Sequence, residues 1–192
     1  MFTPTVVVKQ DVDTDIQEFI RFLYRWSQEK QDLIIRAYPD LVNAVQKGEK
    51  DGQELVANFV REQYRMRKEN IDVLVTDMGV QIRTDGMRVL EKLGEVMEYS
   101  RPEDDAGYTV IPTLLPFSPL QYPIFFFSLE RFLRTNATSV ASSFGMIHVL
   151  AHEVSHFIFF DILSQMSEEV HTKCDKTINY FAKEILAPIV MN

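Results

Sequence analysis

Three of the four histidines in this chain lie in one apolar stretch, HVLAHEVSHFIFFDIL (His148–Leu163). Within it, His152, Glu153 and His156 form the pattern HExxH. On a helix, residues four apart lie one turn apart and only about 40° around the axis, so both imidazoles can reach one metal ion. Glu153 lies beside them and can hold a water molecule bound to that ion. The pattern predicts a zinc metallopeptidase with two histidine ligands and a glutamate as general base.

The surroundings of the motif predict that it is buried. The stretch from Ser139 to about Ser164 is apolar nearly all round, which is typical of a helix in the centre of a core. Burying two imidazoles and a carboxylate together costs several kcal/mol unless they are hydrogen-bonded or bind a metal. We therefore favour a functional Zn²⁺ site over a hydrogen-bonded pair of core histidines.

A catalytic zinc ion takes a third protein ligand and keeps one position open. His148 lies one turn upstream of the motif, and no Gly-x-x-His follows His156 at the distance that metzincins require. The side chains available downstream are Glu168, Glu169, His171, Asp175 and Glu184. Composition and spacing leave the choice among these side chains open.

The end of the chain bears on this choice through a resemblance. DKTINYFAKEILAP (Asp175–Pro188) resembles the helix E-x-x-A-N-x-F-A-x-x-L-L-x-P of ImmA/IrrE-type metallopeptidases, which are gluzincin-like. VLAHEVSHF (Val149–Phe157) is similar to the same family and to the archaeal minigluzincins. The resemblance covers roughly residues 108–192 and does not reach the first hundred. It implies a small zincin-like core with a short β-sheet, the HExxH helix and a third-ligand helix.

The resemblance assigns two further site residues. Asp175 stands where the family has its metal-binding glutamate, and Asn179 stands where an amide accepts the N–H of the first histidine ligand. Asp175 is a competent zinc ligand but one methylene shorter, so its helix must approach the metal more closely. If it does not, Glu169, His171 or water takes the third position. Alternatively, Asn179 has a structural role, and its amide hydrogen-bonds with groups other than the histidine ligand.

The stabiliser of the oxyanion is open among His148, His171 and Tyr180, and each has the alternative of a structural role. The segment Tyr122–Leu129 predicts a strand near the site. In peptidases of the class that the chain resembles, an edge strand pairs with an extended substrate. We expect at least two of the three phenylalanine rings in this segment to belong to the core.

The remaining pattern predicts an α+β fold, with a mostly helical N-terminal lobe of unknown role (1–103) and a zincin-like core (104–192). The charged break SRPEDDAG (Ser100–Gly107) separates the two. Apolar periodicity predicts helices at 13–26, 31–45, 53–68, 84–99, 139–164 and 175–186 and strands at 108–115 and 123–129, with 71–86 ambiguous between a hairpin and helix ends.

Composition limits the partners of the protein. A net charge of −8 argues against nonspecific nucleic-acid binding and against an anionic membrane. A single cysteine and the lack of a signal-peptide pattern fit a cytoplasmic protein. The expected partner is a protein or peptide substrate, and the sequence does not indicate an oligomeric state.

Two other functions are compatible with the pattern. ImmA/IrrE-type proteins, as the resemblance implies, can act as regulators that bind or cleave repressors, so the protein can be a regulatory protein-binding module with slow or no turnover. Leu74–Leu93 faintly resembles a DNA-binding helix-turn-helix, but Asp85 falls where an apolar residue is needed and the chain is acidic.

Overall fold

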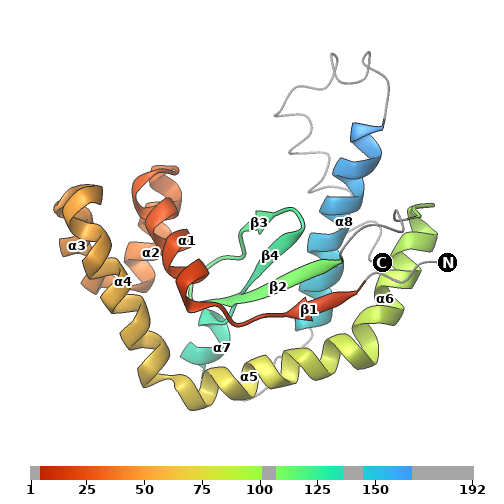
Figure 1. Cartoon of the computed structure of the whole chain (residues 1–192), viewed down its shortest axis with the longest axis horizontal. Helices are drawn as coiled ribbons and strands as arrows, with labels where there is room; N and C mark the ends of the chain where they lie inside the picture. The colour runs from red at the N-terminus through yellow and green to blue at the C-terminus, as the bar shows by residue number, and fades with distance from the viewer. Residues whose placement is uncertain (1–4, 101–106, 136–144, 166–192) are drawn as a thin grey trace.

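The computed structural model describes residues 5–100, 107–135 and 145–165 (Figure 1). In these ranges the chain is mostly helical and contains one small sheet of four strands in the order β1-β2-β4-β3. β1 (Val6–Val8), β2 (Tyr108–Thr113) and β4 (Ile124–Ser128) are parallel, and β3 (Leu120–Gln121) pairs with β4 in the antiparallel direction. The predicted α+β class is confirmed.

The two predicted strands are β2 and β4, and they are the central strands of the sheet. Each is buried along most of its length, which explains their continuous apolar sequence. Phe125, Phe126 and Phe127 all lie in the core. Tyr122–Leu129 is therefore not the edge strand, because β3 takes that position next to β4. The sequence analysis missed β1 and β3, which are three and two residues long and too short to show a pattern.

Two helices of the N-terminal part differ from the prediction in their bounds. α1 (Val12–Tyr24) is capped by Asp11, whose carboxylate accepts the Thr14 N–H at 3.0 Å, so the helix begins one residue before the predicted 13. The predicted helix at 31–45 is broken into α2 (Gln28–Ala37), a 3₁₀ turn η1 (Pro39–Leu41) and α3 (Val42–Gln46). Pro39 disfavours helical backbone at the preceding residue and cannot donate a helical hydrogen bond, which explains the break.

Between residues 48 and 96 the chain is helical almost without interruption. α4 (Gly48–Met66) is followed by α5 (Lys68–Gln81), a π-helical segment η2 (Ile82–Gly86) and α6 (Met87–Val96). Because η2 continues α5 directly into α6, the segment 71–86 forms no hairpin. For the same reason 74–93 contains no turn of the kind that a helix-turn-helix needs, and that interpretation is wrong.

Two helices follow the sheet strands in the C-terminal part. α7 (Glu130–Arg134) directly follows β4. α8 (Met146–Ser164) begins one residue after Gly145, which has extended backbone, and so starts later than the predicted Ser139. The predicted helix at 175–186 lies outside the described residues.

One core cluster joins the helices and the sheet. It contains residues of α1, α4 and α5 together with residues of β2, β4 and α8. In Figure 1 the helices α1 to α4 lie at one end of the sheet and α8 lies near the other. The N-terminal ends of β2 and β4 are therefore the ends nearest α8, where the HExxH motif is found. β1 comes from the predicted N-terminal lobe and β2 from the predicted core, and the division at 103/104 stays a prediction.

Candidate functional site

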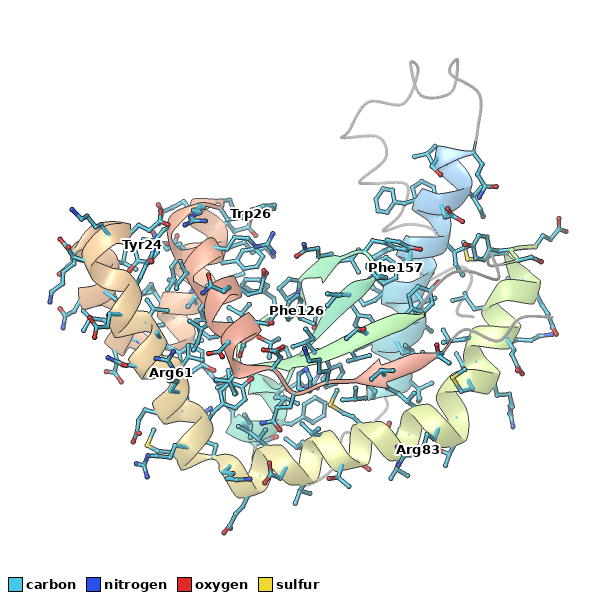
Figure 2. The ribbon with its side chains drawn as sticks, in the orientation of Figure 1. Tyr24, Trp26, Arg61, Arg83, Phe126 and Phe157 are labelled. Carbon is cyan, nitrogen blue, oxygen red and sulfur yellow. The ribbon has the colours of Figure 1, made fainter. Side chains whose placement is uncertain are left out.

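α8 carries the HExxH motif and packs against η2 and against β2. Leu150 and Ile147 approach Gly86 of η2 so closely that a Cβ added at Gly86 would lie 3.0 Å and 3.4 Å from their side chains. Two turns after Leu150, Phe157 stacks on Tyr108 of β2 with ring centroids 5.3 Å apart. Figure 2 shows Phe157 between the helix and the strands. These contacts fix the rotation of α8, and thereby the direction in which the motif points.

The two motif histidines converge. The Nε2 atoms of His152 and His156 are 3.0 Å apart, and the rings meet edge to face with centroids 4.4 Å apart. His156 is 2% exposed, whereas His152 is half-buried. Two imidazole ligands of a tetrahedral zinc ion, with Zn–N bonds of about 2.0–2.1 Å, have nitrogens about 3.4 Å apart. A small opening of the pair would give that spacing, so the donor set fits the metal that the sequence predicts.

Glu153 completes the described part of the motif. Its side chain is buried, with 8% exposure, directly beside His152 in the sequence. Ser155, the second variable residue of HExxH, donates a hydrogen bond of 2.7 Å to the His152 carbonyl. The Ser155 hydroxyl is thus occupied by the helix backbone, as is common for serine inside helices.

His148 lies one turn before His152 and is exposed. The 40° offset per turn places its side chain close to the column formed by His152 and His156. His148 remains a candidate for the oxyanion stabiliser.

The other predicted site residues lie outside the described ranges. These are the third-ligand candidates Glu168, Glu169, His171, Asp175 and Glu184, the partner Asn179, and the oxyanion candidate Tyr180. Among residues 5–100, 107–135 and 145–165, no group of three or more His, Cys, Asp or Glu side chains is arranged to hold a metal ion. Of the predicted metal ligands, His152 and His156 are the two that lie within the described residues, and their side chains are close together.

The sequence analysis missed a pocket beside the motif. It has a volume of about 370 Å³ and is lined by Leu120, Tyr122, Phe157, Phe160, Asp161 and Ser164. Four of these residues follow the motif on α8, and two come from the edge strand β3 and the turn after it. Helical spacing could have placed Phe157, Phe160, Asp161 and Ser164 on one face, but the contribution of β3 needed the sheet order.

Comparison of the chain with protein-family models, curated proteins and solved structures finds no match. Of the described helices, α8 is also the one that is long and apolar enough to cross a membrane. Half of its most apolar window is buried inside the protein, and the core helices of soluble proteins have the same properties.

Because the comparisons find no match, the chemistry of the site is argued from its own residues.

Proposed function

We propose that this protein is a zinc-dependent metallopeptidase. The observation that carries the proposal is the pair of imidazole Nε2 atoms 3.0 Å apart on adjacent turns of one helix, with a buried carboxylate at the next position. His152 and His156 would hold Zn²⁺, and Asp175 is the proposed third ligand. The zincin-like character of the C-terminal part is a component of the same proposal.

The chemistry divides between the metal and the chain. Bound Zn²⁺ supplies a Lewis acid that polarises a peptide carbonyl and lowers the pKa of water. Glu153 would take a proton from the attacking water and pass it to the leaving nitrogen. Its carboxylate is shielded from solvent. Burial keeps the carboxylate in one orientation, and few water molecules other than the attacking one can hydrogen-bond to it. α8 fixes the distance between this carboxylate and the two imidazoles.

The test compares zinc content and peptide cleavage in three chains. We expect purified wild type to bind about one zinc ion, and His156→Ala to lose most of it because only one imidazole remains. Glu153→Gln should keep the zinc and lose cleavage by about 10²–10⁴-fold, the range for removing a general base. A wild-type chain that binds no zinc would refute the proposal.

Two further variants locate the third ligand and separate the regulatory alternative. Asp175→Ala should lose zinc, while Glu169→Ala, the matched acidic control, should retain it. If Glu169→Ala loses zinc and Asp175→Ala does not, the assignment of the third ligand is wrong but the metal centre stands. A regulatory module without turnover would keep its biological effect in Glu153→Gln.

A further inference from the structure

The pocket after the motif has apolar walls and a carboxylate. The rings of Tyr122, Phe157 and Phe160 and the side chain of Leu120 line it, and Asp161 and Ser164 contribute its polar groups. Tyr122 and Phe160 are 56% and 40% exposed, so the pocket opens to solvent rather than into the core. An edge-to-face contact between Tyr122 and Phe157, with centroids 5.2 Å apart, holds one wall in place.

Asp161 is fixed in position, and the part of the chain that the structure describes places no positively charged partner beside it. Its Oδ2 accepts a hydrogen bond from the Tyr99 hydroxyl and another from Gln165 Nε2 at 3.2 Å. In residues 5–100, 107–135 and 145–165, Asp161 forms no ion pair, and its Oδ1 accepts no hydrogen bond. Burial of Tyr99 and its hydrogen bond to Asp161 raise the pKa of the Tyr99 phenol, which therefore stays a donor. The carboxylate is held in place by neutral donors.

The pocket lies next to the motif and to the edge of the sheet. Phe157 directly follows His156, and Phe160 lies four residues after His156, which is about 6 Å along α8. Leu120 belongs to β3, one of the two outer strands of the described sheet, and an extended peptide can add to such an edge as a further strand. A peptide bound along β3 would place one of its side chains over the pocket.

We propose that this pocket binds the side chain of a lysine or arginine of the peptide substrate. The aliphatic stem would pack against Phe157 and Phe160, and the cationic end would meet Asp161. The net charge of −8 also favours a basic ligand. This inference rests on the proposed peptidase function, because it assigns the substrate class of the same site.

The test uses arginine and citrulline, which have nearly the same shape but differ in charge. A set of otherwise identical octapeptides carries arginine or citrulline at one position at a time. Their binding to the full chain with Glu153→Gln is measured by calorimetry, so that no turnover is needed. We expect one position at which arginine binds about tenfold more tightly than citrulline, because a charged hydrogen bond is lost.

Three variants in the same background assign that preference to Asp161. Asp161→Asn should reduce the ratio to within about twofold, since the amide keeps the shape but not the charge. Tyr99→Phe should keep the preference, because it removes a hydrogen bond and leaves the carboxylate. Asp85→Asn removes an equal charge from the exposed surface of η2, and it should also keep the preference.

The outcomes separate this inference from the proposed function. Equal binding of arginine and citrulline peptides at every position, or no measurable binding of either, overturns the inference. An arginine preference that remains in Asp161→Asn also overturns the inference. If the preference depends on Asp161 but the chain with intact Glu153 cleaves none of the peptides, the pocket stands and the peptidase proposal fails.

Discussion

At the scale of single residues, Asp15 is a buried carboxylate away from the HExxH motif. It is 0% exposed and accepts hydrogen bonds from Leu114 N and the Tyr64 hydroxyl, both at 3.0 Å, and from the Thr113 hydroxyl. Burial raises the pKa of Asp15 from 3.8 to about 6, and the three hydrogen bonds oppose this effect without cancelling it. Asp15 thus links α1 and α4 to the end of β2 at the cost of a buried charge.

The raised pKa predicts a definite pH dependence of stability. Between pH 3.8 and about 6 the folded state binds more protons at Asp15 than the unfolded state does, so its contribution to stability falls as pH rises. At 1.36 kcal/mol per pKa unit, the ionised form costs up to about 3 kcal/mol above pH 6. Asp15→Asn cannot ionise, so the stability of the variant relative to wild type should increase by that order between pH 4 and pH 7.

The measurement is urea unfolding of wild type and Asp15→Asn at both pH values. Comparing differences removes the contributions of carboxylates with lowered pKa values, such as Asp11, whose stabilisation is lost on acidification. The same difference between variant and wild type at both pH values would show that Asp15 does not titrate in this range.

At the scale of elements, Gly52 decides how closely α3 and α4 pack. A Cβ at this position would lie 2.2 Å from the Tyr24 hydroxyl and 2.3 Å from the Ala44 carbonyl oxygen. The Ala44 contact is with backbone, so α3 would have to move as a whole. We expect Gly52→Ala to lower the free energy of unfolding by about 1–3 kcal/mol, as overpacking does.

Gly79 of α5 is the matched control for Gly52. Among the described residues, a Cβ there would meet just the end of the Arg83 side chain, at 3.4 Å. Gly79→Ala should therefore stabilise the protein by about 0.5–1 kcal/mol, the usual gain of alanine over glycine inside a helix. Thermal unfolding of both variants tests the pair, and similar shifts in Tm would mean that α3 and α4 can separate at low cost.

The elements also show which patterns could be predicted. β2 and β4 are buried and apolar over five or six residues, and α1 has a clear amphipathic face, so local sequence was sufficient for them. The strands β1 and β3 form because neighbouring strands pair with them, which the local sequence does not record. Likewise, helical geometry alone predicts that the two imidazoles of HExxH converge. The pocket at Asp161 depends in addition on β3 and Tyr99, which are distant from Asp161 in the sequence.

At the scale of the whole molecule, contacts across the break at residues 100–107 are extensive. Val6–Val8 pairs with Tyr108–Val110. The Tyr38 hydroxyl, at the end of α2, donates to the Leu114 carbonyl at 2.6 Å and to Glu130 of α7. Arg67, between α4 and α5, reaches the same Glu130 carboxylate at 3.3 Å. These interactions join residues of segment 1–103 to residues of segment 104–192. Each buried polar group among them has a hydrogen-bond or ion-pair partner on the other side of the break.

We therefore expect a fragment of residues 104–192 not to fold alone. Without β1 the parallel edge of β2 is exposed, and without Tyr38 and Arg67 the buried Glu130 carboxylate loses two of its donors, which costs several kcal/mol. The fragment should give poorly dispersed amide signals in NMR spectra, and dispersion should return when residues 1–103 are added as a separate chain. A well-dispersed spectrum of 104–192 alone would instead identify it as an independent domain. The metal site would then need no support from the helical lobe, and zinc binding by the fragment would follow.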